Sequence, residues 1–487
     1  MPDVTPPSMP GATLVLDIGK SNAKLALIGE GGEVVRSATV ANVSEPDRAR
    51  GYLALGVNRL ETWLLDEVPR LLRDIVPARM AVTTHGAAFC ALGADGLVLP
   101  PIDYEWDGYG ETTAAFDASL ANFGHHGTPR LGKGLNAGRQ IDFVQRRWPG
   151  AAELIQYWLP YPQYWSWWLS GIACTEVSSL GCHTGLWSPD QNRYSDWAIA
   201  RGIARRFAPP RRAWDVIGEL RPRLATRWGL PPGIEVIAGV HDSNACLARY
   251  LQRYPAATIV STGTWCVAMA PGAPTGRLTP ERDELVNVAV DGRSVPTAKF
   301  MAGREFARLS AGCDPGAATI AALHEVLAEG WMAMPSYANG SGPMPDRLGQ
   351  VLLRGVPAAP GIDGVPMRLR AALAALYCAD MTMLLIEALG PHESTSPAAG
   401  MPVILEGPLA GNAAYLAALS AALQPRSLLQ SADTLEGTAR GAWMLAWWQV
   451  PGANAGGAPT PVHAPNREVA ELLRAHRRSF LACVKTI

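Results

Sequence analysis

Residues 13–35 read TLVLDIGKSNAKLALIGEGGEVV, and this stretch decides how the N-terminal part of the chain should fold. Strand-forming residues occupy Leu14–Asp17 and Ala23–Ile28, with the polar tetrapeptide GKSN between them. Two apolar runs joined by turn residues are typical of a β-hairpin. A second turn, EGG, leads to Glu33–Ala38, which we expect to form a third strand.

A helix and another strand should follow this hairpin. Leu60–Ile75 has the spacing of Leu and Val that is typical of a helix, and Ala78–Thr83 reads as a strand that ends at Thr84-His85-Gly86. Strands and a helix in this order indicate an α/β domain with a mixed sheet.

A similar pattern returns in the second half of the chain. Ile234–Val240 predicts a strand that runs into His241-Asp242 and a helix, SNACLARYL. The runs Ala257–Ser261 and Trp265–Ala270 then predict a second hairpin, with Thr262-Gly263-Thr264 at its tip. The chain should therefore contain a second α/β unit.

Further elements complete this second unit. Val403–Leu405 predicts a strand that feeds the turn EGPLAGN, and helices are expected over residues 413–423 and 435–448. A last amphipathic, basic helix is expected over Glu468–Phe480, with its charges on a solvated face. We predict a flexible tail over residues 1–11, an N-terminal domain over 12–245 and a C-terminal domain over 246–487.

Composition excludes several classes of function. The 487 residues carry 42 basic and 43 acidic side chains, a formal charge of −1, whereas a nucleic-acid or anionic-membrane partner would favour a basic face. The eight cysteines contain no C-x-x-C pair and read as reduced core residues of a cytoplasmic protein. The N-terminus lacks the basic and apolar regions of a signal peptide. The sequence contains no charge-free stretch of 18 apolar residues, so we expect no transmembrane helix.

Aromatic residues concentrate in one segment of the middle of the chain. Residues 157–171 read YWLPYPQYWSWWLSG and hold four of the 16 tryptophans. We expect a helix that packs these rings into a core. Tryptophan faces also stack on sugar rings, and the sequence does not show which of them are exposed.

The first candidate site is the hairpin turn after Asp17. Small residues let backbone N–H groups approach a phosphate closely, and a carboxylate at the end of a strand can hold Mg²⁺ through water. Either Lys20 or Lys24 could meet the phosphate charge. An Asp-x-Gly turn is also common in hairpins that bind nothing, and no P-loop motif is present.

The second candidate is Asp242, where a strand ends and a helix begins. One interpretation is a helix N-cap, since Asp is favoured there. The other is a carboxylate that accepts the proton of a sugar hydroxyl, kept ionised by the helix N-terminus. In a loose phosphoryl-transfer transition state the proton leaves late, so that positioning matters more than basicity. His241 is the rival base.

Two further turns are candidates for nucleotide binding. Thr262, Gly263 and Thr264 place hydroxyls and a glycine at a hairpin tip, and residues 406–412 turn from a strand into a helix through glycines. Such turns are generic when taken singly. Paired with the first hairpin, the second could clamp a nucleotide's phosphates.

The order of these four motifs resembles that of the FGGY carbohydrate kinases, members of the actin-like ATPase superfamily. The resemblance spans about residues 13–450. It implies an α/β fold of two ribonuclease-H-like domains, each a mixed sheet flanked by helices, with ATP and a sugar in a cleft between them. It implies ATP and Mg²⁺ as cofactors, with the metal held through water at Asp17 and Asp242, and Asp242 as the catalytic base. The residues that it implies for the nucleotide are Asp17, Gly19, Lys20, Ser21, Asn22, Lys24, Thr262, Gly263, Thr264, Gly407, Gly411 and Asn412.

The same resemblance suggests where the sugar binds. The strand that ends in His85-Gly86 looks like a family strand near the sugar, and the segment PPIDYEWDGYG takes the place of a family segment that contacts sugar hydroxyls. His85, Tyr104, Glu105 and Asp107 are therefore candidate sugar contacts, together with Asp242. The segments CTEVSSLGCHTGLWSPDQNRYSDW and FMAGREF also resemble family segments.

Departures from the family pattern bear on the substrate. The first turn is GKSN where many members have G-T-T or G-S-S, the adenosine motif begins Glu406-Gly407 where two glycines are usual, and the common W-x-D-x-R is missing. The chain looks closer to the rhamnulose and fuculose kinases than to glycerol kinases. A small ketose or deoxyketose is the expected substrate.

The main alternative is a sugar or nucleotide sensor on the same fold without catalysis, which the unusual turns would also fit. Another actin-like ATPase, such as a chaperone or a filament former, or an unrelated α/β enzyme, are further alternatives. We expect a sugar as the partner, no nucleic acid and no membrane, and the sequence leaves a homodimer open. We also expect Asp17 and Asp242 to face each other across the gap between two domains.

Overall fold

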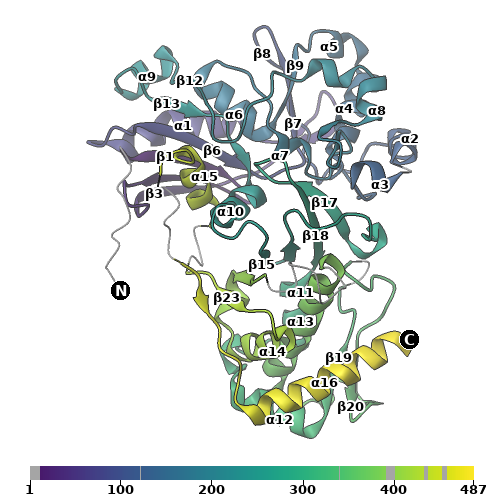
Figure 1. The fold of residues 1–487 in the computed structure, drawn as a ribbon. Coiled ribbons are helices and arrows are strands. Elements are labelled where there is room, and N and C mark those ends of the chain that lie inside the picture. Colours follow the sequence, from purple (N-terminus) through teal and green to yellow (C-terminus); the bar gives the residue numbers. More distant parts are fainter. Residues whose placement is uncertain are drawn as a thin grey trace. The chain divides into compact units, whose positions relative to one another are not determined.

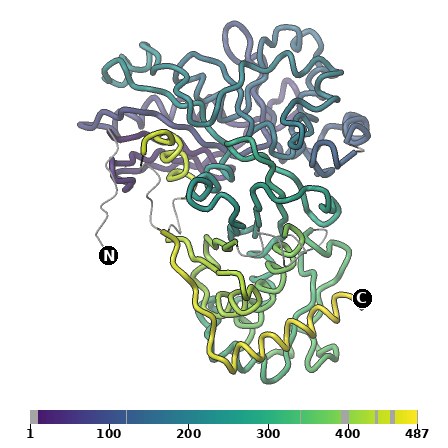
Figure 2. The backbone as a smooth tube through the Cα atoms, viewed as in Figure 1, coloured from purple at the N-terminus to yellow at the C-terminus, as the bar shows by residue number. Residues whose placement is uncertain are grey.

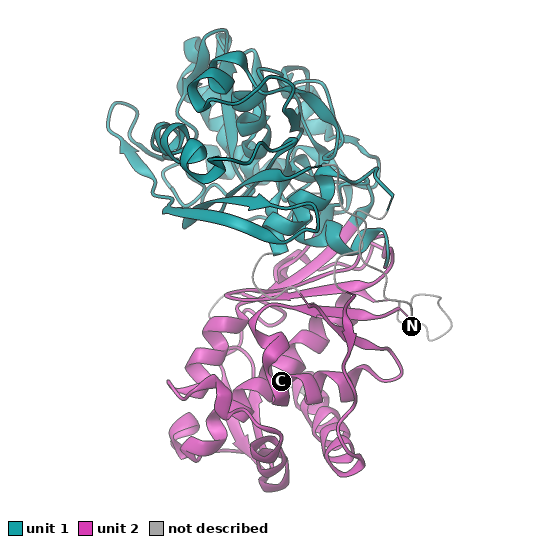
Figure 3. Ribbon diagram, turned by 90° about the vertical axis from the view of Figure 1, so that its left-hand side faces the viewer, with its two compact units in different colours: residues 1–253, 286–294, 436–456 teal, residues 254–285, 295–435, 457–487 magenta. Residues whose placement is uncertain are grey.

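The computed structural model describes residues 11–120, 122–338, 341–390, 401–432, 437–451 and 458–486. They form two compact units (Figure 3). The first unit consists of Met1–Arg253, Val286–Ser294 and Glu436–Gly456, and the second of Tyr254–Leu285, Val295–Leu435 and Gly457–Ile487. The predicted tail lies outside the described residues except for Gly11. The predicted domain boundary after residue 245 stays a prediction; the compact units first change over between Arg253 and Tyr254.

The first unit is built on a seven-stranded mixed sheet (Figure 1). Its strands lie in the order β12 (Val216–Glu219), β13 (Glu235–Ile237), β6 (Arg79–Thr84), β1 (Thr13–Ile18), β2 (Asn22–Ile28) and β3 (Val34–Ala41), and β14 (Val240–His241) also pairs with β6. β1 and β2 form the predicted antiparallel hairpin, and β1 runs parallel to β6. The predicted three strands at the N-terminus are therefore confirmed.

Both faces of this sheet are covered, which explains why β1 is apolar almost throughout. On one face, Leu14 and Leu16 pack with the buried side of α1 (Val57–Leu72), for example Leu64. On the other face, Val15 packs with Trp443 of α15 (Gly437–Ala446). A strand buried on both faces needs apolar residues at successive positions rather than at alternate ones.

The rest of the first unit consists of short strands and helices. The strands are β4 (Glu45–Asp47), β5 (Tyr52–Ala54), β7 (Phe89–Gly93), β8 (Gly96–Leu99), β9 (Tyr157–Pro160), β10 (Trp187–Ser188) and β11 (Arg193–Tyr194). The helices are α2 (Glu111–Ser119), α3 (Phe123–His126), α4 (Ala137–Arg147), α5 (Pro149–Glu153), α6 (Tyr161–Ser170), α7 (Val177–Leu180), α8 (Asp196–Ala200), α9 (Pro222–Trp228) and α10 (Asp242–Leu251). The aromatic segment forms β9 and α6, and Trp158, Trp165 and Trp168 are buried. The expected core helix is confirmed.

The second unit is built on another seven-stranded mixed sheet. Its order is β17 (Glu284–Val288), β18 (Ser294–Phe300), β16 (Cys266–Met269), β15 (Thr258–Thr262), β22 (Val403–Glu406), β23 (Leu428–Gln430) and β24 (Thr460–Pro461). Residues 286–288 of β17 and Ser294 of β18 are themselves assigned to the first unit. The other elements are β19 (Trp331–Met334), β20 (Gln350–Leu353), β21 (Val356–Pro357), α11 (Ala302–Ser310), α12 (Ile320–Glu329), α13 (Met367–Leu389), α14 (Ala413–Leu423) and α16 (Arg467–Thr486). The predicted second hairpin is β15–β16.

The two sheets repeat one strand order. In the first unit it is β3-β2-β1-β6-β13, and in the second it is β18-β16-β15-β22-β23. In both sheets the opening hairpin, β1–β2 or β15–β16, is antiparallel. The first strand of that hairpin also pairs in parallel with the next strand of the sheet, β6 or β22. The end of β15, at Thr262, therefore occupies in its sheet the place that the end of β1, next to Asp17, occupies in the other.

Helix α13 is the core helix of the second unit. Among the described residues it is the one helix long and apolar enough to cross a membrane by length and composition, and 83% of its most apolar window is buried inside the protein. It packs with α11, α12 and α14, and the backbone trace in Figure 2 shows it among these green helices. Burial by neighbouring helices accounts for its apolar composition without a membrane.

Candidate active site

The ends of three parallel strands bring the candidate residues of the first unit together. Asp17 on β1 pairs with Thr83 on β6, and Thr83 pairs with Val240 on β14. Asp17 therefore lies beside the end of β6, and Asp242 follows β14 on the other side of that strand. The carboxyl ends of parallel strands meet at one sheet edge, which is where α/β proteins bind ligands.

This arrangement corrects one expectation. Asp17 and Asp242 were expected to face each other across the gap between two domains, but both belong to the first unit. The physical reason is that β1 and β14 both pair with β6 and so belong to a single sheet.

Asp242 is the first residue of α10, and His241 occupies the N-cap position without a side-chain cap. The Asp242 carboxylate oxygen Oδ1 accepts the backbone N–H of Ser243 at 2.6 Å and lies 3.3 Å from the Ser243 hydroxyl. Among the described residues, no hydrogen bond engages Oδ2. The side chain is thus not an N-cap but a partly exposed carboxylate in the first turn of the helix.

His241 lies against the same carboxylate. Its Nε2 is 3.1 Å from Asp242 Oδ1 and 3.5 Å from the Cys182 thiol, while its Nδ1 is 3.3 Å from the Asn244 amide nitrogen. Burial lowers the pKa of His241, against the opposing effect of Asp242. A neutral imidazole with both nitrogens in contact with protein groups is poorly placed to act as the rival base.

The predicted phosphate turn is held by the protein itself. The Gly19 N–H donates to Asn22 O at 2.9 Å, and the Asn42 side chain donates to Gly19 O at 2.8 Å. Ser21 and Asn22 are exposed, and Lys24 pairs with Asp17 in the strand register. Gly19, Ser21, Asn22 and Lys24 thus stay candidates for nucleotide contact.

Lys20 has a different environment from the one expected. Its ammonium forms an ion pair with the fully buried carboxylate of Asp103 and lies 3.4 Å from Glu105 Oε2. Burial alone would raise the pKa of Asp103, but hydrogen bonds from the Glu105 N–H, Lys20 and Ser44 lower it overall. Since two carboxylates already neutralise Lys20, it anchors the 103–105 segment in this structure.

The candidate sugar contacts lie beside this ion pair. The ring of His85 is 5.4 Å from that of Tyr104 and 5.0 Å from that of Tyr161. His85 Nδ1 lies 2.8 Å from Gly86 O, whereas its buried Nε2 has no hydrogen-bond partner among the residues that the structure describes. Burial lowers the pKa of His85, and Asp242 is among the charges that act on it. Nε2 of His85 is therefore a buried polar atom that a ligand hydroxyl could satisfy.

Glu105 and Asp107, which follow Tyr104 in the chain, have exposed side chains. Glu105 forms an ion pair with Lys20. Asp107 has no such ion pair among the described residues. The predicted sugar residues thus divide into the buried His85, the partly buried Tyr104 and an outer pair of carboxylates.

The second unit carries the other predicted turns. The Thr262 hydroxyl donates to Glu406 O at 2.6 Å and accepts the Leu409 N–H at 3.2 Å. Gly407 has φ +86°, and a Cβ there would lie 1.9 Å from Thr262 O. Thr262 and Gly407 are therefore a fitted pair that holds the two turns together, and the Thr262 hydroxyl is already used.

The tips of these turns are more open. Thr264 is exposed, and Gly303, at the start of α11, packs so closely that a Cβ would lie 2.8 Å from Gly263 O. Gly411 is exposed, with nothing within 4 Å of an added Cβ. Asn412 is the N-cap of α14, where its Oδ1 accepts the Tyr415 N–H at 3.0 Å. Open backbone at Gly263, Thr264 and Gly411 is compatible with a nucleotide, while Asn412 also has a structural task.

Sequence reasoning missed two buried carboxylates near these segments. Asp103 is the partner of Lys20, and Glu176 caps the short helix α7 by accepting the backbone N–H groups of Ser178 and Ser179 at 3.0 and 3.2 Å. Burial raises the pKa of Glu176 to about 7, against the lowering effect of these hydrogen bonds. The signal for Glu176 was present, since Glu-x-Ser-Ser after a Thr can cap a helix. Asp103 gave none, because its partner is 83 residues away.

Comparisons with known proteins agree with this architecture. Residues 254–455 match the family model described as "Carbohydrate kinase FGGY, C-terminal domain". The crystal structure of a carbohydrate kinase from Novosphingobium aromaticivorans is 32% identical, covers 98% of this chain and 99% of its own, and superposes with a TM-score of 0.86. Glycerol kinase from Plasmodium falciparum, solved with ADP, is 11% identical with a TM-score of 0.75, a likeness of fold alone.

A curated relative gives a more distant match. L-fuculokinase from Salmonella typhi is 26% identical over 278 residues, which are 53% of this chain and 56% of that protein. The alignment thus spans little more than half of the relative's length.

A chain of two mixed α/β units, with this family match and a relative of nearly equal length, belongs to the FGGY family of carbohydrate kinases. The predicted family and the predicted pair of mixed α/β units are confirmed. The cleft between the units stays a prediction.

Proposed function

We propose that this chain catalyses ATP-dependent phosphorylation of a hydroxyl of a small sugar, with Asp242 as the catalytic base. The observation that supports it most is the state of Asp242. Its Oδ1 is held by Ser243 and contacts His241, while Oδ2 has no hydrogen-bond partner among the described residues. A carboxylate held by one oxygen leaves the other to accept a proton from a bound hydroxyl.

The residues of the first unit would bind and orient the sugar. His85 Nε2 is a buried atom without a hydrogen-bond partner in the described part of the chain, and the Tyr104 ring lies beside the His85 ring. The Tyr104 ring contacts the His85 ring, and the negative charge of Asp242 acts on His85. Asp242 would orient the hydroxyl and take its proton as the hydroxyl oxygen becomes bonded to phosphorus. General-base assistance of this kind contributes about 10²–10⁴-fold to a rate.

The nucleotide and metal fit the residues present. Among the described residues no group of three or more His, Cys, Asp or Glu side chains could hold a metal by itself. That suits Mg²⁺, which takes one or two carboxylates and completes its shell with water and phosphate oxygens. Asp17 and Asp242 would supply these carboxylates. When bound, MgATP supplies the phosphoryl group, and the bond to its leaving ADP oxygen breaks as the sugar oxygen attaches.

The turns of the second unit would hold the nucleotide. Backbone at Gly263 and Thr264 would approach the phosphates, and the open space at Gly411 would admit the adenosine. ADP is present in the solved glycerol kinase of this fold, which supports ATP as the donor.

A ketose or 6-deoxyketose of the L-rhamnulose, L-fuculose or pentulose type is the proposed substrate. Its support is the similarity to L-fuculokinase, together with the sequence departures at the first turn and at Glu406. The alternative of a sensor without catalysis predicts binding of sugar or nucleotide without turnover.

A coupled assay of ADP release, run over pentuloses, 6-deoxyhexuloses, hexuloses and polyols, tests the proposal. We expect one ketose class to stimulate ADP release strongly. Asp242→Asn should lower kcat by about 10³-fold or more and leave sugar binding largely intact. Asp95→Asn, which changes an exposed aspartate of the same unit, is the matched control. Turnover within a few-fold of wild type in Asp242→Asn would remove Asp242 from the role, and binding without turnover on every sugar would favour the sensor.

A further inference from the structure

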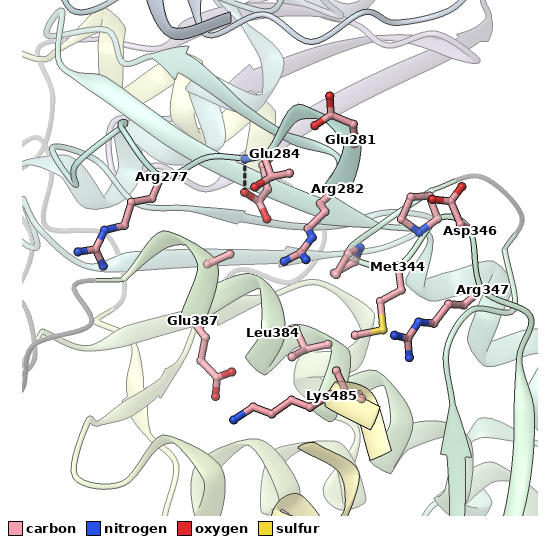
Figure 4. A pocket seen from close by; sticks show the side chains of 15 residues that line it. Arg277, Glu281, Arg282, Glu284, Met344, Asp346, Arg347, Leu384, Glu387 and Lys485 are labelled. Atoms are coloured by element: carbon pink, nitrogen blue, oxygen red, sulfur yellow. Dashed lines mark hydrogen bonds between the residues drawn. The ribbon is translucent and has the colours of Figure 1, made fainter. Parts of the chain in front are cut away.

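A separate hollow of about 630 Å³ lies within the second unit (Figure 4). Its walls come from the segments 277–284 and 343–347, from the last turns of α13 and from the end of α16. Its volume falls in the usual range for small-molecule sites. None of the residues proposed above for the sugar or the nucleotide lines it.

Four cationic side chains line this hollow: Arg277, Arg282, Arg347 and Lys485. Figure 4 shows them approaching from three different segments, with Arg282 directed into the space above Leu384 and the Arg347 guanidinium beside Met344. No side chain of the four forms a hydrogen bond or ion pair with the residues that the structure describes. Each positive charge is therefore available to a ligand.

The carboxylates of the hollow do not cancel this charge. Both oxygens of Glu387 accept from Arg477 at 2.9 Å, so that its charge is neutralised from behind. Glu284 is buried, accepts the Thr279 N–H at 2.6 Å, and has a pKa raised by burial. Glu281 and Asp346 are exposed, and their carboxylates point away from the Arg282 and Arg347 guanidiniums (Figure 4).

Arg347 adds an independent observation. Its Nη1 has less than 1 Å² of exposed surface and no hydrogen-bond partner in the part of the chain that the structure describes. A buried guanidinium nitrogen left without an acceptor is costly, because it has lost its water without gaining another partner. An anion in the hollow would provide the missing acceptor.

We propose that this hollow binds a small metabolite carrying phosphate groups. Guanidinium groups bind phosphate through two parallel hydrogen bonds, and Arg282 and Arg347 offer two such groups around one space. Met344, Leu384 and Val484 provide an apolar wall for the carbon skeleton. The site is independent of the proposed kinase chemistry and would bind its ligand in a protein that lacks turnover.

Calorimetric titration of the full chain with inorganic pyrophosphate tests this site. The protein is first saturated with ADP, so that the proposed nucleotide site does not compete for the probe. We expect binding that weakens as salt is raised, since charge carries it. The double variant Arg282→Gln/Arg347→Gln should lose at least about tenfold in affinity, which is the effect expected of two lost charge-assisted contacts.

The matched control is Arg368→Gln. Arg368 is an exposed arginine of the same unit, outside the hollow, and should leave pyrophosphate affinity unchanged. The single variant Arg282→Gln changes an exposed side chain, so that its fold should be kept and its affinity should fall about threefold or more. Absence of binding by wild type at millimolar pyrophosphate, or equal affinity in the double variant, would overturn the proposal.

Discussion

Nε2 of His241 lies 3.1 Å from Oδ1 of Asp242, the oxygen that Ser243 also engages through its backbone N–H. The polar contacts of this carboxylate thus gather on one of its two oxygens. That asymmetry gives the aspartate a defined orientation before any substrate arrives. If Asp242 is the proposed base, His241 would be a positioning residue, because it contacts that carboxylate.

Removal of this contact should affect turnover more than binding. In His241→Phe we expect kcat to fall by about 10- to 100-fold with KM for the sugar changed less than threefold, because the carboxylate loses one restraint but keeps its charge. Steady-state kinetics that separate kcat from KM measure this.

His241→Gln, which keeps a polar group near Oδ1, should recover part of the loss. Cys182→Ala, which removes the other neighbour of Nε2, serves as the control and should stay close to wild type. An unchanged kcat in His241→Phe would show that Ser243 alone orients Asp242.

The ion pair of Lys20 with Asp103 yields a second prediction. Because Lys20 anchors the segment that carries Tyr104, Lys20→Met should raise KM for the sugar about tenfold and change KM for ATP little. A lysine that binds phosphate would produce the reverse pattern.

Lys24→Met is the comparison, since Lys24 was the other candidate for phosphate contact and lies opposite Asp17 in the hairpin. Kinetics with each substrate varied in turn distinguish the two lysines. A tenfold rise in KM for ATP in Lys20→Met, with KM for the sugar unchanged, would return Lys20 to its predicted role.

The turn after β22 gives a pair of glycine variants with opposite expected outcomes. Gly407 has φ +86° and a Cβ there would lie 1.9 Å from Thr262 O, so Gly407→Ala should destabilise the protein by about 2 kcal/mol or more. Thermal or denaturant unfolding measures the change.

Gly411→Ala is the matched control, because nothing lies within 4 Å of its added Cβ. We expect its stability to stay within about 0.5 kcal/mol of wild type, as for most surface changes. If adenosine occupies that open space, KM for ATP should nevertheless rise. Equal stability of the two variants would contradict the structure of this turn.

Glu176 predicts a pH dependence of stability with a definite sign. Its pKa is raised from 4.5 to about 7 in the folded protein, so between these values the folded state binds more protons than the unfolded state. The contribution of Glu176 to the free energy of unfolding is therefore most favourable below about pH 4.5 and declines as pH rises toward 7, by at most about 3 kcal/mol.

Denaturant unfolding of wild type and Glu176→Gln between pH 5 and 8 measures this as a difference. The stability of wild type relative to the variant should fall across this range. A difference that stays constant with pH would mean that Glu176 is ionised throughout, with its hydrogen bonds to α7 outweighing burial.

The fold could be predicted from the sequence wherever neighbours in space are neighbours in the chain. Turn residues between apolar runs predicted a hairpin around Gly19 and another around Gly263, and the structure contains both. Asp242 was chosen as a candidate because it lies where a strand ends and a helix begins. The sequence did not indicate that the contacts of this carboxylate gather on Oδ1, because they depend on how the backbone places Ser243.

Contacts between distant segments could not be read in the same way. Nothing in the sequence around Lys20 indicates that its partner is Asp103. A lysine that follows a glycine in a turn is equally compatible with a phosphate ligand. Thr262 was chosen for its hydroxyl, yet that hydroxyl serves Glu406 and Leu409 across the sheet. Local patterns specify which elements form, while ion pairs and hydrogen bonds over long separations decide which side chains remain available.

Helix α15 carries a consequence for how this gene product could be divided. Although it is far from β1 in sequence, its Trp443 and the adjoining Trp447 pack with Val15 and Ala81 of the sheet that contains β1, and Trp447 donates to the Thr13 hydroxyl at 2.8 Å. Synthesis must therefore proceed from β1 to beyond residue 446 before this strand gains its second cover. An amino-terminal fragment that stops near residue 253 should expose that apolar face and aggregate, and addition of the missing helix as a separate peptide should restore its solubility.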